Sequence, residues 1–160
     1  MKELNIRIAI KIYEYEELNY DDRELMDAAC EATKRSYAPY SHFSVGAAAR
    51  LADQTIVTGS NQENAAYPSG LCAERTTLFY ANSRYPDQAV ETLAIAASNE
   101  RGDFLEEPIP PCGACRQVMV ETEKRFKHPM RILLFGKKGI YELKNVGALL
   151  PLSFDASAMV

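Results

Sequence analysis

The sequence predicts an α/β sandwich, in which helices cover both faces of a central sheet. Segments with the apolar or alternating patterns of strands recur along the chain, and helical patterns of about 10–15 residues separate them. The composition, 47% apolar and 25% charged, is that of an ordinary folded protein. No internal repeat, linker or low-complexity tract divides the chain, so we expect residues 1–160 to form a single domain.

The first expected element is a strand near the N-terminus. Isoleucines occupy every second position from 6 to 12 and alternate with Arg, Ala and Lys, which is the period-two pattern of a half-buried strand. We treat residues 1–20 as a strand-like extension. A helix is expected next, because Asp21 or Asp22 can cap its start and Pro39 forces its end.

The middle of the chain continues with strands and a second helix. Alternating apolar residues predict a strand over 43–51, and a turn leads from it into a further strand at 55–59. Residues 61–70 have no regular pattern. A helix is expected over 72–80, and the continuous apolar run 92–97 is typical of a strand buried on both faces.

The last third of the chain is expected to hold one more long helix. Three prolines within 108–111 lead into this helix, which we place at 112–128. Strands are predicted at 131–135 and 139–143, and a helical turn at 145–150 closes the chain.

Charge and hydropathy limit the partners and the location of the protein. The net charge is −4 and the pI is near 5.3, so the chain lacks the excess positive charge with which proteins bind nucleic acid or anionic lipid. No apolar run approaches the roughly 18 residues of a membrane helix, and no secretory signal precedes the first strand. We therefore expect a cytoplasmic protein without nucleic-acid or membrane partners. Its four cysteines should stay reduced and serve a metal or catalysis.

Three of the cysteines have the arrangement of metal ligands. Cys112 and Cys115 form the C-x-x-C pair of PCGAC, and Cys72 lies upstream in LCAER. On the first turn of a helix, such a pair places both sulfurs near backbone N–H groups that lack an intrahelical partner, and the helix dipole favours thiolates there. Cys72 also lies at a predicted helix start. Three thiolates at two helix N-termini suit a tetrahedral Zn²⁺ ion.

The number of ligands separates a catalytic zinc site from a structural one. Structural sites have four protein ligands, whereas catalytic sites have three and leave a position for water. The remaining thiol, Cys30, lies beside alanines in the middle of a predicted helix, where a free cysteine packs as a small apolar residue. His42 and His128 lie in loop-like segments and are expected to be solvated. Three ligands and a water are therefore favoured.

Glu74 places a proton-transfer group next to these ligands. It stands two residues after Cys72, in Cys-Ala-Glu, where its carboxylate is well placed to move protons of the metal's water. Zinc deaminases combine His or Cys ligands, a non-ligating Glu and a later P-C-x-x-C, and the chain has these motifs in that order. We expect the adjacent Arg75 to hydrogen-bond the thiolates and draw charge away from the metal.

Four sequence blocks resemble the cytidine deaminases, specifically their small three-cysteine zinc class. The blocks are YAPYSHFSVGAA (37–48), SNQENAAYPSGLCAERT (60–76), PCGACRQV (111–118) and LLPLSF (149–154). The resemblance extends from about residue 36 to residue 154. It implies a three-layer α/β/α sandwich with a mixed central sheet, hydrolytic deamination of cytidine and deoxycytidine, a pyrimidine nucleoside as ligand, and a homotetramer with shared active sites.

The resemblance also implies roles for individual residues. It makes Cys72, Cys112 and Cys115 zinc ligands and Glu74 the proton shuttle. Other family positions contact the substrate, and these are Phe43, Asn61, Gln62, Glu63 and Ala73. Phe154 would reach the active site of a neighbouring subunit. Gln62 departs from the family pattern, which usually has an Ile-like residue there. The change is harmless if the Gln62 side chain points away from the pocket, and it affects which sugar is preferred if the side chain points inward.

Simpler structural interpretations of five of these positions stay open, and so do other functions. Phe43 could pack in the core, Phe154 could cap its own subunit's core, and Arg75 could be a surface residue. Asn61 could be a turn residue and Glu63 a solvated acid. A structural zinc module is the first rival function, and it needs a fourth ligand. An editing deaminase for tRNA or single-stranded DNA is the second, and it needs a basic surface. A deaminase of nucleotides or nucleoside antibiotics is the third, although no phosphate-binding glycine loop is evident.

Overall fold

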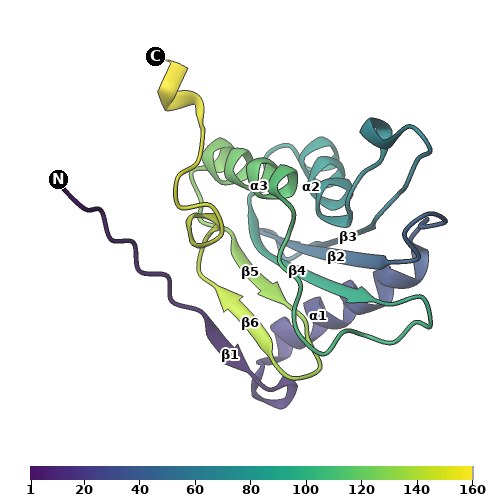
Figure 1. Cartoon of the computed structure of the whole chain (residues 1–160). Coiled ribbons are helices and arrows are strands. Elements are labelled where there is room, and N and C mark those ends of the chain that lie inside the picture. The colour runs from purple at the N-terminus through teal and green to yellow at the C-terminus, as the bar shows by residue number, and fades with distance from the viewer. Residues whose placement is uncertain (160) are drawn as a thin grey trace.

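The computed structural model describes residues 1–159 and is built around a mixed six-stranded sheet (Figure 1). The strand order is β1-β6-β5-β4-β2-β3, in which β4 and β5 are parallel and all other neighbours are antiparallel. The strands are β1 (Lys11–Tyr13), β2 (Ser44–Leu51), β3 (Ile56–Ser60), β4 (Val90–Ser98), β5 (Arg131–Leu134) and β6 (Ile140–Leu143). The α-helices are α1 (Tyr20–Ala32), α2 (Ala73–Arg84) and α3 (Gly113–Phe126), and short 3₁₀ turns lie at 15–17, 33–35, 67–69, 146–148 and 156–159.

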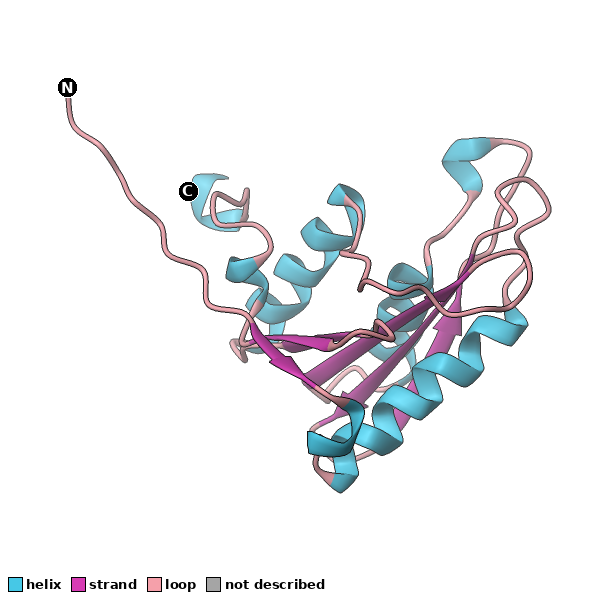
Figure 2. Cartoon of the chain, turned by 60° about the horizontal axis from the view of Figure 1, so that its bottom comes forward, coloured by secondary structure: helices cyan, strands magenta, loops and turns pink. Residues whose placement is uncertain are grey.

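Helices cover both faces of the sheet, which confirms the predicted three-layer α/β/α sandwich. Helix α1 lies on one face, and α2 and α3 lie side by side on the other (Figure 2). The strands alternate accordingly: Ala48 of β2 and Ala94 of β4 pack toward α1, whereas Ala47 and Leu93 pack toward α2 and α3. Small residues let α1 lie close to the sheet. A Cβ atom at Gly46 would stand 2.2 Å from the carbonyl oxygen of Ala29.

The predicted N-terminal strand is mostly wrong, because only Lys11–Tyr13 form strand β1. Residues 1–10 are extended but belong to no strand, and they lie exposed beyond the sheet (Figure 1). The physical reason is the length of the neighbouring strand. Lys11 pairs with Glu142, and β6 ends one residue later at Leu143, so the alternating segment has no backbone partner further toward the N-terminus.

A charge network beneath the sheet edge holds β1 in place. The Lys11 Nζ atom lies 3.2 Å from the Glu142 carboxylate. Arg131 on β5 pairs with the same carboxylate at 3.3 Å and also with Asp22 on α1. Asp22 and Glu142 are both buried, so these ion pairs join β1, β6, β5 and α1 into one unit.

The ends of other helices and strands differ from the predicted ones for local reasons. The cap of α1 is Asn19, whose side chain accepts a hydrogen bond from the Asp22 N–H at 2.8 Å, and neither Asp21 nor Asp22 is the cap. Helix α2 continues one turn beyond the expected residue 80, to Arg84, because the helix-ending Pro86 comes only two residues later. The strand predicted from residue 43 begins at Ser44, and Phe43 joins neither described hydrophobic cluster, so the structure does not support its packing in the core.

Candidate metal centre and substrate cleft

Three loops meet at one edge of the sheet because of the strand directions. β3 and β4 both run antiparallel to β2, which lies between them, so their carboxyl ends lie at the same edge as the start of β2. The loop after β3 leads to α2, and the proline-containing loop after β4 leads to α3. Ligand sites of α/β sheets commonly lie outside the carboxyl ends of strands.

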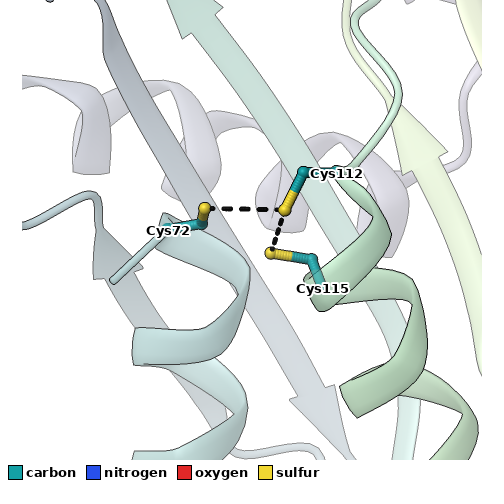
Figure 3. A group of neighbouring side chains, drawn as sticks. All are labelled: Cys72, Cys112 and Cys115. Carbon is teal, nitrogen blue, oxygen red and sulfur yellow. Dashed lines mark hydrogen bonds between the residues drawn. The ribbon is translucent and has the colours of Figure 1, made fainter. Parts of the chain in front are cut away.

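The three cysteines of the two motifs converge there (Figure 3). Cys72 is the residue before α2, Cys112 is the residue before α3, and Cys115 lies on the first turn of α3. The Sγ atoms of Cys72 and Cys112 are 3.7 Å apart, those of Cys112 and Cys115 are 3.3 Å apart, and all three lie within 4.8 Å of one another. The structure thus brings together residues that are far apart in the chain, as the motifs predict.

The donor set fits a zinc ion. Sulfur atoms around tetrahedral Zn²⁺, each at about 2.3 Å from the ion, stand about 3.8 Å from one another, close to the spacing found here. Within residues 1–159 these three side chains are the only group of three or more that could hold a metal. Cys30 packs with the cluster on the α1 face, across the sheet, so it does not supply a fourth thiolate.

The electrostatics of the cluster favour a thiolate at Cys72. A hydrogen bond from Cys115 and the nearby Arg75 guanidinium lower the pKa of Cys72 to about 5, against the opposing effect of its burial. Cys30 behaves in the opposite way, because burial raises the pKa of its thiol to about 12. The four cysteines therefore divide into three thiols that form one cluster and a separate, half-buried thiol that stays protonated.

Arg75 contacts the cluster, as expected. Its Nη2 atom lies 3.8 Å from the Cys72 sulfur and 3.4 Å from the carbonyl oxygen of Gly70. Its Nε atom is buried and has no hydrogen-bond partner among the described residues. A guanidinium that keeps a buried, unpaired N–H group beside sulfur atoms favours thiolates over neutral thiols as its neighbours.

Glu74 is buried beside the cluster on the first turn of α2. Only 4% of its surface is exposed. Burial raises the pKa of its carboxyl, and the negative charge of Cys72 acts in the same direction. Ala73, the preceding residue, is fully buried. Neither residue lines the cleft described next.

A cleft of about 430 Å³ opens beside Cys72. This volume falls in the usual range for small-molecule sites, about 300–1,000 Å³. Its lining comes from the loops before β2 and after β3 and from the start of α2, and comprises Tyr40, Ser41, Asn61, Gln62, Glu63, Asn64, Tyr67, Gly70, Leu71, Cys72 and Arg75. Asn61, Gln62 and Glu63 are predicted site residues, whereas Phe43 is absent from the lining.

Asn61 and Glu63 hold the cleft loops together. The Asn61 side chain accepts a hydrogen bond from the Val45 N–H at 2.8 Å and donates one to the Phe43 carbonyl at 2.9 Å. Glu63 accepts hydrogen bonds from the N–H groups of Tyr40, at 3.0 Å, and Ser41, at 3.2 Å. The Ser41 side chain and the Tyr40 N–H lower the pKa of Glu63, which keeps it ionised.

The Gln62 side chain bonds to residues outside the cleft lining. Its amide donates hydrogen bonds to the Arg35 carbonyl at 3.3 Å and to the Ser60 hydroxyl at 3.2 Å, and neither of these residues lines the cleft. Its backbone forms the cleft wall by pairing with Leu71 through N–H···O bonds of 2.8 and 2.9 Å.

Two aromatic residues of the lining were not predicted. Tyr40 and Tyr67 lie on different loops, and both are exposed at the cleft. Each tyrosine lies inside one of the sequence blocks that carry the resemblance, Tyr40 in 37–48 and Tyr67 in 60–76, and this position is the available signal. Its meaning depends on the pairing of distant segments, such as the bridges from Gln62 to Tyr37 and to Leu71.

Phe154 does not line the cleft of its own chain. It is 62% exposed on the C-terminal segment, which passes over α3. Its carbonyl accepts a hydrogen bond from Gln117 at 2.8 Å, and the adjacent Asp155 pairs with Lys124 at 2.9 Å. It does not cap the core of its own subunit. Separately, none of the helices within residues 1–159 is both long enough and apolar enough to cross a membrane.

Comparisons with known proteins agree with this geometry. Residues 19–128 match the model of the cytidine and deoxycytidylate deaminase zinc-binding region. A cytidine deaminase of Halalkalibacterium halodurans is 39% identical over 87% of this chain and 98% of its own length, and one of Sporosarcina psychrophila is 40% identical over 84% and 92%. The crystal structure of a cytidine deaminase from Burkholderia pseudomallei is similar with a TM-score of 0.71 at 37% identity, covering 86% of this chain and all of that one. The chain belongs to the family of cytidine and deoxycytidylate deaminases with this zinc-binding region.

Proposed function

We propose that the protein catalyses the zinc-dependent hydrolytic deamination of cytidine and deoxycytidine to uridine and deoxyuridine, with release of ammonia, in pyrimidine salvage. The observation that carries the proposal is the convergence of three thiol groups and buried Glu74 at one end of a cleft sized for a small molecule. The relatives named as cytidine deaminases support the substrate class.

Cys72, Cys112 and Cys115 are the proposed zinc ligands. When bound, Zn²⁺ acts as a Lewis acid that makes water nucleophilic near neutral pH. Three thiolates bring more negative charge than imidazole ligands would and weaken this effect. The free N–H groups at the starts of α2 and α3, and the Arg75 guanidinium, offset that charge.

Glu74 is the proposed proton shuttle. Its carboxylate takes a proton from the attacking water, delivers it to N3 of the cytosine ring, and later protonates the departing amino group. The water oxygen bonds to C4 as the C4–N bond breaks, so water and cytidine give uridine and ammonia. The raised pKa of Glu74 suits this role, because a carboxyl group that exchanges protons near neutral pH works best when its pKa lies closer to that range.

Asn61 and Glu63 are the proposed contacts for the sugar hydroxyls. The Asn61 amide nitrogen uses one hydrogen on Phe43 and has a second to donate, and the Glu63 carboxylate can accept further hydrogen bonds. Phe43 and Ala73 do not line the cleft, so the nucleoside contacts that we propose for them rest on the resemblance alone. Because the Gln62 amide is bonded outside the cleft, its departure from the family pattern should not change sugar preference.

The charges of the cleft favour a free nucleoside over a nucleotide. Arg75 is the one cation of the lining, and it is engaged with Cys72, whereas Glu63 is ionised and would repel a phosphate. Ion pairing of basic residues near α3 and β6 also argues against a surface for nucleic acid. Lys124, Lys137 and Lys138 are each paired with an acidic side chain.

We further propose a cytoplasmic homotetramer in which Phe154 of one subunit reaches the cleft of another. The exposure of Phe154 on a segment that extends from the body of the chain is compatible with this role. A monomer with full activity would contradict it.

A nucleoside panel tests the proposed function. Purified zinc-loaded protein is incubated with cytidine, deoxycytidine, cytosine, cytidine monophosphate and adenosine, and the ultraviolet change and ammonia release are followed. We expect turnover of the first two and little of the others. Turnover of the monophosphate alone, or of none of the five by a protein that holds zinc, would contradict the proposal.

A further inference from the structure

A row of exposed aliphatic side chains near the N-terminus has no role in the cleft. Its members, here called the isoleucine stripe, are Leu4, Ile6, Ile8, Ile10 and Ile12. They are 78%, 51%, 44%, 47% and 61% exposed, in that order. Figures 1 and 2 both show this segment running away from the body of the molecule. Contiguous exposed apolar residues of this kind mark interaction surfaces.

The stripe continues an open sheet edge. β1 is the last strand of the sheet and pairs with β6 on one side only, among the strands that the structure describes. Tyr13 packs toward the α1 face, so its strand neighbour Ile12 lies on the opposite side, and strand pairing of residues 4–10 would place the rest of the stripe on that side too. An open edge joined to a segment with strand patterning is a template for pairing with another chain.

The family match does not include this segment. The family match begins at residue 19, after both the stripe and β1. The cysteine cluster and the cleft lie at the ends of β3 and β4, whereas β1 is at the opposite border of the sheet. The segment is therefore an addition to the shared fold.

We propose that residues 2–14 pair in antiparallel fashion with the same segment of a second copy of this chain, with the two-fold axis at Ile8. Each arm then lies along the open edge of β1 in the other copy and extends its sheet. A symmetric contact of this type must be self-complementary, because the same surface appears on both sides.

The sequence is self-complementary in this register. Across the axis at Ile8, Leu4 lies opposite Ile12, and Ile6 lies opposite Ile10, so the stripe meets itself along its whole length. On the other face, Arg7 lies opposite Ala9.

At the ends of the paired segments, Lys2 lies opposite Glu14, which places opposite charges together. Moving the axis by one residue would be unfavourable in either direction. An axis at Ala9 places Arg7 opposite Lys11, and an axis at Arg7 places the two Arg7 side chains together.

A second copy is favoured over an anionic membrane or a nucleic acid. The basic residues of the arm are followed at once by three exposed acids, Glu14, Glu16 and Glu17. These would repel a polyanion, whereas in the proposed pairing Glu14 receives Lys2 of the other copy.

Cysteine crosslinking tests the contact and its register in the full-length zinc-loaded protein. Ile8→Cys places one thiol of each copy at the axis, whereas Leu4→Cys places the two thiols about 27 Å apart. Both positions are exposed, so Leu4→Cys controls for random collisions, and the unchanged chain controls for the native cysteines. On mild oxidation we expect on the order of tenfold more disulfide-linked dimer from Ile8→Cys, because pairing raises the effective concentration of the thiols. Equal crosslinking of the two variants would overturn the proposal.

A matched pair of charge substitutions tests the faces of the contact. The reporter is the double variant Leu4→Cys/Ile12→Cys, whose thiols meet across the two copies. Adding Ile8→Glu places like charges at the axis and should abolish crosslinking, whereas adding Ala9→Glu places a carboxylate opposite Arg7 and should retain it. Similar loss from both additions would overturn the proposal. So would a chain that does not crosslink but sediments with vesicles of anionic phospholipid or with a single-stranded oligonucleotide.

Discussion

The two borders of the sheet are built in opposite ways. At the cleft, short segments that are not strands are tied to one another by many hydrogen bonds: Tyr37 to Asn61, Gln62 to Leu71, and Glu63 to the loop before β2. At the other border, a segment with strong strand patterning has only three residues in the sheet, although a charge network anchors them. The loops of the cleft bond to one another within one chain, whereas the N-terminal segment leaves backbone and apolar groups for a partner.

The contrast shows that side chains can supply the backbone hydrogen bonds that a neighbouring strand would otherwise make. At the cleft, these bonds fix the loops in place. The Asn61 amide bonds both an N–H and a carbonyl around the start of β2, as a strand residue would. No side chain does this for residues 1–10, which stay exposed. Four experiments distinguish the borders, taken from the largest expected effect to the smallest.

Cys115→Ser should abolish both zinc binding and activity. Loss of a ligand should lower metal affinity by more than the roughly 10–100-fold that follows removal of a hydrogen-bond partner of a ligand. Cys30→Ser is the matched control, because Cys30 packs on the far face of the sheet. Zinc content and turnover are measured on both variants. Retention of zinc by the first, or its loss from the second, would contradict the assigned ligands.

Glu74→Gln should keep zinc and lose activity. The amide has nearly the same shape but cannot accept and return a proton, so kcat should fall by about 10²–10⁴-fold. Glu121→Gln, on the exposed surface of α3, is the control and should leave kcat unchanged. A Glu74→Gln protein with turnover near that of the unchanged chain would rule out the shuttle.

A substrate without the 3′-hydroxyl should be used about 10–100-fold less efficiently than cytidine. This range corresponds to the roughly 1–3 kcal/mol cost of leaving a buried polar group unpaired. The comparison is of kcat/KM for cytidine and 3′-deoxycytidine, and Asn61→Asp serves as a variant without the side-chain N–H donors. Equal efficiency with both substrates would exclude the proposed sugar contacts.

Arg131→Met should weaken the β1 border and leave the cleft active. It removes the cation shared by Asp22 and Glu142, both buried, so the free energy of unfolding should fall by about 1–3 kcal/mol. Arg101→Met, in an exposed loop, is the control for urea unfolding. A large loss of kcat in the Arg131→Met protein would show that the two borders are coupled.

The parts predicted well from sequence are those that local spacing determines. C-x-x-C on a first helical turn, and Cys-Ala-Glu at the start of another helix, place their side chains by helix geometry alone. The layers also follow from local patterns, because alternation in β2 and β4 decides which face each residue meets.

The parts that sequence could not provide depend on distant segments. The length of β1 is limited by the end of β6 at Leu143, about 130 residues away along the chain. The places of Tyr40 and Tyr67 in the cleft depend on which loops pair there. The position of Phe154 relative to a second subunit likewise cannot be predicted from the residue pattern of a single chain.

Cys72 and Cys112 each stand immediately before a helix, and neither caps it with a side-chain hydrogen bond. In the proposed coordination, one ion therefore braces the first turns of α2 and α3 against sliding past each other. It crosslinks two segments 40 positions apart, as a covalent bridge would, yet a chelator can undo the link without cutting the chain.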